Sequence, residues 1–99
     1  MHLVQILIPL ASSSDSRQAR FESVLDDLTT RFGGATAFVN SPARGLWQSG
    51  VKREEDRIVT VEVMVEEFEA DWWASYRKTL EERFDQQELV VRAIEAVRV

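Results

Sequence analysis

Apolar residues recur along the chain in two distinct periods, which together predict four strands and two helices. Residues 1–8 are apolar at nearly every position, which predicts a strand buried on both faces at the centre of a sheet. Pro9 is expected to end its ladder, because proline has no N–H to donate. The clearest alternation predicts a strand over 58–65, with Val59, Val61, Val63 and Val65 on one face and Ile58, Thr60, Glu62 and Met64 on the other. Residues 35–40 and 88–97 are the other expected strands, with Asn40-Ser41-Pro42 breaking the former.

Two amphipathic helices are expected between these strands. The first carries an apolar stripe made of Phe21, Val24, Leu25, Leu28 and Phe32. The serines of 12–16 offer N-terminal caps, as does Asp15 with Gln18, and Gly33 stands where a left-handed residue closes a helix. The second helix carries Trp73, Tyr76, Leu80 and Phe84, with Trp72 beside the stripe, and its N-terminal end is acidic through Glu66, Glu67, Glu69 and Asp71.

The element order β-α-β-β-α-β predicts the fold class. Right-handed crossovers in both halves give an α+β ferredoxin-like sandwich, in which a four-stranded antiparallel sheet of order 4-1-3-2 carries both helices on one face. A length of 99 residues fits a single domain over 1–99.

Composition narrows the function classes. The absence of cysteine excludes disulfides, thiolate metal sites and cysteine nucleophiles, and it suits a cytoplasmic protein. The N-terminus has no basic leader, and its apolar run is too short to span a bilayer. A net charge of −5 disfavours nucleic acid and anionic membranes as partners. No cofactor is expected.

The sheet face opposite the helices is expected to be an interface. If the valines of 59–65 face the helices, the open face receives Ile58, Thr60, Glu62 and Met64 from that strand. The first strand adds either Leu3, Gln5 and Leu7 or Val4, Ile6 and Ile8. The fourth adds either Val90, Arg92 and Ile94 or Leu89, Val91 and Ala93. Every combination leaves an apolar surface, which favours a homodimer built sheet against sheet or through a hairpin reaching across.

Gln5, Glu62 and Arg92 are expected side by side on that face. The functional interpretation is a polar cluster in which Glu62 acts as a base. The favoured interpretation is a cross-strand ion pair bridged by an amide.

The segment between the second and third strands holds the other candidate binding residues. Gly45–Gln48 is expected to fold back on Val51–Glu54 around a turn at Ser49-Gly50. Trp47 stands in this connection and either stacks on a ligand or packs, the latter being favoured. The cations Arg31, Arg44, Lys52 and Arg53 could bind an anion with the N–H groups of Gly33 and Gly34. The glycines follow a helix instead of opening one, so a C-cap with charges paired to Glu54, Glu55 and Asp56 is favoured.

Other chemistries find little support. The only histidine, His2, would need carboxylates such as those of 66–71 to hold a metal, and no metal is expected. No histidine is placed to activate the serines of 12–16. RNA-recognition domains share this topology, but the strand at 57–64 has no aromatic residue for base stacking and carries an acid in its middle. No catalytic constellation is recognisable.

Four short motifs carry a resemblance to a known family. Arg31-Phe32-Gly33-Gly34-Ala35-Thr36, Gly45-Leu46-Trp47, Arg53-Glu54-Glu55 and the run 83–90 resemble a bacterial domain family of unknown function. Its members pair an Arg-Phe-x-Gly-x-Thr turn with Gly-x-Trp, a later glutamate and Arg-Phe-x-Gln. The resemblance covers about residues 21–92, implies the same fold and lends no activity. Many relatives look exported, whereas this chain lacks a signal. It draws attention to Thr36, Trp47, Glu54 or Glu55, and Gln86 as a shared cluster.

Two functional hypotheses follow. The leading one is a homodimeric binding or interaction module, with a small-molecule ligand at the dimer interface as the first form to test. The alternative is a cofactor-independent enzyme of the dimeric α+β barrel type, with Glu62 or Glu54 as the working carboxylate. A cavity containing Trp47 and a carboxylate of raised pKa would favour the enzyme, and paired surface polar groups over a filled core would favour the module.

Overall fold

The computed structural model describes residues 1–10, 15–49 and 52–99, with the side chains of 10, 15–18, 39–49 and 52–57 outside that description. Six elements follow one another: β1 (His2–Leu10), α1 (Asp15–Phe32), β2 (Thr36–Ser49), β3 (Lys52–Val65), α2 (Ala70–Arg83) and β4 (Val90–Glu95). The expected element order is therefore confirmed.

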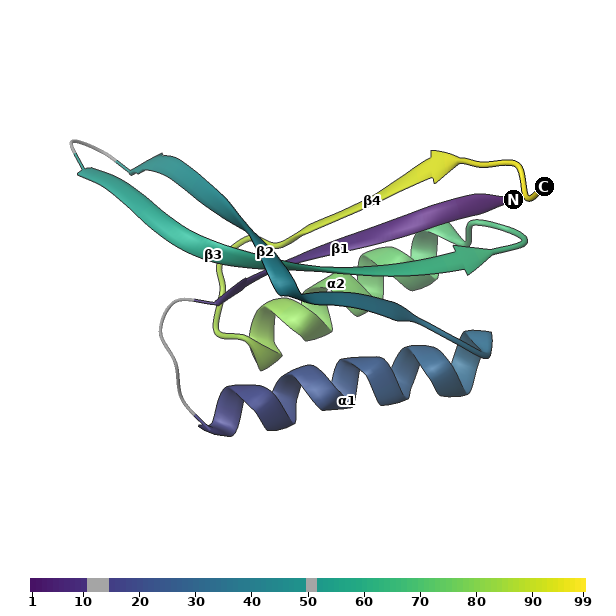
Figure 1. The fold of residues 1–99 in the computed structure, drawn as a ribbon, viewed down its shortest axis with the longest axis horizontal. Coiled ribbons are helices and arrows are strands. Elements are labelled where there is room, and N and C mark those ends of the chain that lie inside the picture. Colours follow the sequence, from purple (N-terminus) through teal and green to yellow (C-terminus); the bar gives the residue numbers. More distant parts are fainter. Residues whose placement is uncertain (11–14, 50–51) are drawn as a thin grey trace.

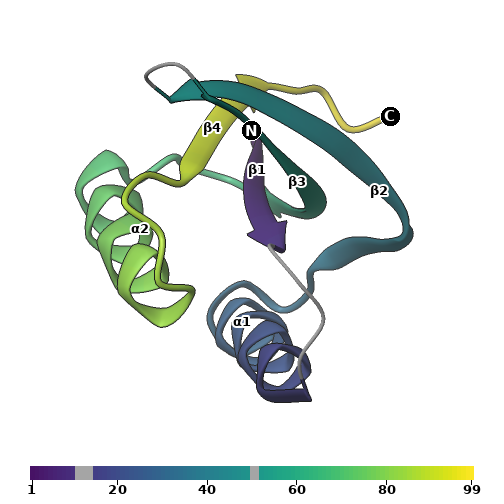
Figure 2. The same ribbon diagram turned by 90° about the vertical axis from the view of Figure 1, so that its left-hand side faces the viewer.

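The four strands form one antiparallel sheet in the order β2-β3-β1-β4, which is the ferredoxin-like α+β arrangement predicted from the sequence. Both helices lie on the same face of the sheet, and the opposite face carries no helix (Figures 1 and 2). The sheet and the helix layer are thus two packed layers with the core between them.

The core contains the apolar stripes of both helices, the alternating valines of β3 and one of the two sets that the sequence offered for β1. From the sheet it takes Val4, Ile6 and Ile8 of β1 and the four alternating valines of β3. From the helices it takes Phe21, Val24 and Leu28 of α1 and Trp73, Tyr76 and Leu80 of α2, with Phe84 and Leu89 after the second helix. Leu25, Phe32 and Trp72 are partly buried against this cluster. Alternation in β3 and helical spacing in α1 and α2 therefore assigned these buried faces correctly, and the structure decides the face of β1 that the sequence left open.

Two expected strand ends are wrong. β1 continues through Pro9 to Leu10, which pairs with Arg57. Because β4 accompanies β1 only as far as Leu7, the end of β1 has a neighbour on one side alone, the setting in which strands tolerate proline. β4 is shorter than the expected 88–97.

The second strand does not end at Asn40-Ser41-Pro42. β2 continues to Ser49, and its pairing with β3 shifts register between Phe38 and Ala43. Between these two pairs, four residues of β2 stand against one residue of β3. Such a bulge takes the extra residues, Pro42 among them, out of the regular ladder and lets pairing resume beyond it.

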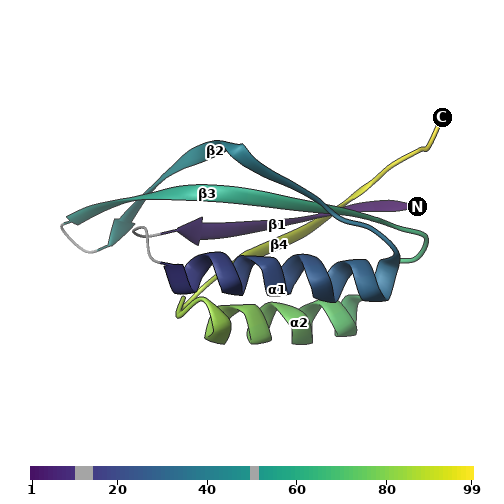
Figure 3. The ribbon, with the colours of Figure 1, turned by 60° about the horizontal axis from the view of Figure 1, so that its bottom comes forward.

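The pairing of β3 with β1 starts at Arg57, so on the N-terminal side of Arg57 the sheet consists of β2 and β3 alone. Among the described residues, the stretches 45–49 and 52–56 pair only with each other, and we call this hairpin the arm. The expected hairpin forms, but its predicted register is wrong: Gly45–Gln48 pair with residues 53–56 and not with Val51–Glu54. Ser49 pairs with Lys52 instead of standing in the turn, and residues 50–51 lie outside the described residues. The arm extends past β1 and both helices, and the molecule is accordingly 43 Å long and 28 by 26 Å across (Figures 1 and 3).

Both helices end in left-handed residues. Gly33 closes α1 with a φ of 86°, and its N–H donates to the carbonyl of Thr29, as expected. At the end of α2 the left-handed residue is Asp85, with a φ of 52°. The N–H groups of Asp85 and Gln86 donate to the carbonyls of Glu82 and Glu81, which is a Schellman motif without its usual glycine. The expected serine caps at 12–14 lie outside the described residues.

Candidate functional site on the open face of the sheet

The open face of the sheet carries one polar row between two largely apolar rows. The strand registers align Thr36 of β2, Glu62 of β3, Gln5 of β1 and Arg92 of β4 across the sheet. One row on, they align Phe38, Thr60, Leu7 and Val90, and on the other side they align Met64, Leu3 and Ile94. Of the alternatives left open by the sequence, β1 therefore presents Leu3, Gln5 and Leu7, and β4 presents Val90, Arg92 and Ile94.

Hydrogen bonds join the central three side chains of the polar row. Arg92 Nε donates to Gln5 Oε1 at 2.8 Å, and Gln5 Nε2 donates to Glu62 Oε2 at 2.7 Å. The Gln5 amide thus receives a bond from the cation and gives one to the carboxylate. This is the amide-bridged ion pair that the sequence favoured.

Apolar side chains border this row and remain accessible to solvent. Four large apolar side chains on this face are each 44–48% exposed, although burial of such groups is favourable: Phe38, Met64, Val90 and Ile94. Together with Leu3 and Leu7 they give the open face its apolar character. Ile58 is the exception on this face, since it is buried.

The arm holds a second group of predicted site residues. Trp47 pairs in register with Glu54, Leu46 with Glu55, and Arg44 pairs with Arg57 at its base. Trp47 therefore stands in a strand, and its expected place in a loop connection is wrong. Its register partner is one of the glutamates singled out with it.

The predicted cluster of Thr36, Trp47, a glutamate and Gln86 is not gathered within one chain. Thr36 pairs with Glu62, eight positions along β3 from Glu54. At about 3.3 Å per residue, roughly 26 Å separates the two pairs along the strand. Gln86 follows α2, and its backbone N–H closes that helix. Thr36 belongs to the polar row, and Trp47, Glu54 and Glu55 belong to the arm.

Arg31 forms its contacts with residues at the start of α2 and not with the arm. Its Nη2 bonds Glu69 Oε2 at 2.8 Å, at the start of α2, and its guanidinium lies 4.2 Å from the centre of the Trp72 ring. The expected partners of the cations were Glu54, Glu55 and Asp56, so for Arg31 this expectation is wrong. The guanidinium is planar and apolar on its faces, and stacking on the tryptophan while bonding the glutamate satisfies both properties.

His2 belongs to no cluster of metal-ligating side chains among the residues that the structure describes. In the described part of the chain, no group of three or more histidine and acidic side chains is placed to hold an ion. The His2 ring lies 5.9 Å from the Phe68 ring, centre to centre, and Glu66, Glu67 and Asp71 are exposed.

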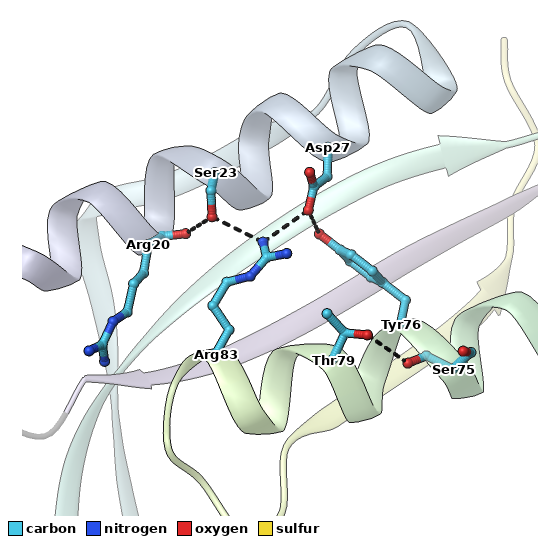
Figure 4. A network of polar contacts seen from close by, with 7 residues as sticks. All are labelled: Arg20, Ser23, Asp27, Ser75, Tyr76, Thr79 and Arg83. Atoms are coloured by element: carbon cyan, nitrogen blue, oxygen red, sulfur yellow. Dashed lines mark hydrogen bonds and ion pairs between the residues drawn. The ribbon is translucent and has the colours of Figure 1, made fainter.

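A polar network between the helices escaped the sequence analysis. Arg83 Nη1 of α2 donates to Asp27 Oδ2 at 2.9 Å and to Ser23 Oγ at 3.0 Å, both on α1 (Figure 4). The Tyr76 hydroxyl donates to the same Asp27 oxygen at 3.0 Å. Burial raises the pKa of Tyr76, and the neighbouring Asp27 carboxylate raises it further. A tyrosine in an apolar stripe was the available signal, because a buried hydroxyl needs an acceptor.

None of the described helices is long and apolar enough to cross a membrane. The sequence matches no family model and no curated protein. Solved structures do match. CutA1 from Pyrococcus horikoshii is 17% identical with a TM-score of 0.58, over 100% of this chain and 86% of that chain. The periplasmic divalent cation tolerance protein CutA from Archaeoglobus fulgidus is 16% identical with a TM-score of 0.60, over 100% and 87%.

A phage SAM lyase in complex with S-methyl-5′-thioadenosine is also similar. It is 16% identical with a TM-score of 0.64, over 95% of this chain and 80% of that chain. At these identities the likeness extends to the fold alone. The neighbours share the ferredoxin-like plan, and their activities differ from one another.

Proposed function

We propose that this protein is a homodimeric binding module whose subunits associate through the open face of the sheet, with a small-molecule ligand held at the interface. The observation that carries the proposal is the polar row of Arg92, Gln5 and Glu62 between rows of exposed apolar side chains. An apolar face with a paired polar centre has the composition of an interface core.

The arm adds support for association. A two-stranded ribbon is marginal in water unless a further strand or layer packs on it. Residues 45–49 and 52–56 have no such neighbour among the described residues. A second subunit covering the open face would also lie within reach of the arm, which brings Trp47 and Glu54 to the edge of the interface.

The arrangement of the polar groups favours a module over an enzyme. Glu62 accepts a hydrogen bond from Gln5, which is itself bonded to Arg92, so the carboxylate is held in a structural ion pair. Cross-strand ion pairs of this kind are more often structural than catalytic.

A thermal-shift screen with a metabolite collection tests ligand binding. The collection includes S-methyl-5′-thioadenosine, which is bound in the similar phage SAM lyase structure, and divalent cations, because another similar structure is that of a divalent cation tolerance protein. A binder raises Tm in a concentration-dependent way. The account predicts a smaller shift for Trp47→Ala than for the wild type, with Ala74→Ser on exposed α2 as the control. Absence of any stabilising ligand would contradict the small-molecule part of the proposal and leave a protein-interaction role.

A further inference from the structure

The charges of the polar row lie on opposite sides of β1. Glu62 is on β3, Arg92 is on β4, and the neutral Gln5 stands between them on the central strand. The row therefore has a negative end and a positive end on the open face.

Each charge retains bonding capacity beyond its own chain. Arg92 uses Nε toward Gln5, and its two terminal nitrogens have no partner among the described residues. Glu62 uses Oε2 toward Gln5, and its Oε1 likewise has none within the described ranges. Terminal guanidinium nitrogens and a free carboxylate oxygen are the groups that form strong charge-assisted pairs.

We infer that a second copy of this chain docks on the open face about a two-fold axis parallel to β1, so that Arg92 of each copy faces Glu62 of the other. The inference rests on the homodimer proposed above and specifies its geometry. A two-fold axis is the commonest symmetry of soluble homo-oligomers and presents the same patch on both copies.

The direction of the axis follows from the charges. Two sheets meet face to face when the axis lies in the plane between them. An axis along β1 exchanges the β3 and β4 sides, which sets each arginine against a glutamate of the other copy. An axis along the polar row, across the strands, would instead oppose Arg92 to Arg92 and Glu62 to Glu62. Like charges juxtaposed in an interface cost several kcal/mol, so the charge pattern selects the axis along β1.

The apolar rows fit the same axis. Met64 of one copy meets Ile94 of the other, while Leu3 and Leu7 on the axis each meet their own equivalent. The axis sets β3, β1 and β4 of one copy against β4, β1 and β3 of the other. The nine residues of β1 at about 3.3 Å each, and three strands about 4.8 Å apart, give a footprint of roughly 30 by 14 Å. That is about 420 Å² before side-chain relief is counted, or about half of the roughly 800 Å² per partner of a standard interface, and β2 and the arm would supply further contact at the edge.

Charge reversal tests the pairing. Glu62→Lys or Arg92→Glu alone should raise the dimer Kd at least about tenfold, since each sets like charges across the interface twice. An equimolar mixture of the two variants should form heterodimers with a Kd near that of the wild type. The double variant E62K/R92E should also dimerise, because the Gln5 amide can exchange its donor and acceptor roles. Sedimentation velocity provides each Kd, and circular dichroism verifies folding.

Cross-linking provides a second test, which can still be made if one of the charge variants does not fold. The chain has no cysteine, so Leu3→Cys introduces a single thiol on the axis. A short bismaleimide should join two Leu3→Cys chains and should not join Ala74→Cys chains, whose thiol lies on exposed α2. Preferred linking of Leu3→Cys to Leu7→Cys in a mixture would contradict this axis and indicate the one across the strands.

The outcomes separate the two proposals. A wild-type dimer that charge reversal leaves unchanged, or whose Leu3→Cys variant does not cross-link, overturns the axis and leaves the homodimer standing. A wild type that remains monomeric overturns the homodimer itself. Weakened single variants, a rescued mixture and a self-linked Leu3→Cys variant support both.

Discussion

Asp27 and Arg83 join the two helices through a 2.9 Å bond between Oδ2 and Nη1, although 55 residues lie between them in the chain. Asp27 Oδ2 also accepts the Tyr76 hydroxyl, so one oxygen fixes two groups of α2. The network sets the relative position of α1 and α2 on the sheet (Figure 4).

Asp27→Asn should destabilise the protein by about 1–2 kcal/mol, because it weakens two hydrogen bonds and removes a partly buried charge. The matched control is Glu69→Gln, which alters the Arg31–Glu69 pair. That pair has a similar length of 2.8 Å, but its side chains are 40% and 58% exposed, against 26% and 41% for Arg83 and Asp27. Exposed pairs contribute little, so the control should cost less than about 0.5 kcal/mol. Urea unfolding measures both, and equal losses would refute the role given to the network.

Tyr76 should make stability depend on alkaline pH. The hydroxyl becomes charged by losing its proton, and burial raises its pKa above the ordinary 10.0. Below that value both states keep the proton, and above it the unfolded chain loses it first. The free energy of unfolding should therefore fall from pH ~10 upward, by at most about 1.4 kcal/mol per unit.

Tyr76→Phe should remove this part of the pH dependence. Because Tyr76 is the only tyrosine, the ultraviolet difference spectrum of tyrosinate reports its titration directly. Ionisation of the folded protein at the ordinary pKa would contradict the buried, Asp27-bonded hydroxyl.

Gly33→Ala should cost about 1 kcal/mol or more, since φ is 86° and side chains are strained in that region. A Cβ at Gly33 or at Gly34 meets no atom within 4 Å, so space does not distinguish them. Gly34 has no positive φ, and Gly34→Ala should be near neutral. Thermal unfolding of the two variants isolates the backbone effect, and equal Tm values would argue against a left-handed Gly33.

Asp85→Gly should stabilise the protein by about 0.5–1 kcal/mol, because glycine adopts the left-handed conformation of the C-terminal cap without strain. Asp85→Ala keeps the strain and loses the local polar side chain, so it provides the control and should not stabilise. Denaturant midpoints decide between the two variants. A destabilised Asp85→Gly would mean that the carboxylate contributes more than the backbone gains.

Much of the fold was predictable because alternation and helical spacing report which face of an element is buried. They placed the four valines of β3 and the stripe from Trp73 to Phe84 correctly, and with them the row of Gln5, Glu62 and Arg92. The ends of the strands were harder to predict from the sequence. Pro9 and Pro42 resemble breakers in sequence, but a missing neighbour and a bulge accommodate them, and both depend on pairing between distant segments.

The candidate site was predictable to the same extent. Strand order and alternation suffice to align the polar row, whereas the partner of Arg31 and the network around Asp27 depend on how two helices meet. The arm was visible only as a hairpin extension, since its length follows from where β1 stops. Its residues Trp47 and Glu54 are paired in register, whereas Thr36 lies in the polar row, and a role of these residues in ligand binding stays a prediction.

The central claim is that the open sheet face joins two copies of the chain. Light scattering coupled to size exclusion at micromolar concentration tests it most directly, with Leu7→Glu on the open face and Ala74→Glu on exposed α2 as charge-matched variants. The account predicts the mass of two 11.4 kDa chains for the wild type and Ala74→Glu, and a monomer for Leu7→Glu. A wild-type monomer, or a Leu7→Glu variant that remains dimeric, would contradict it.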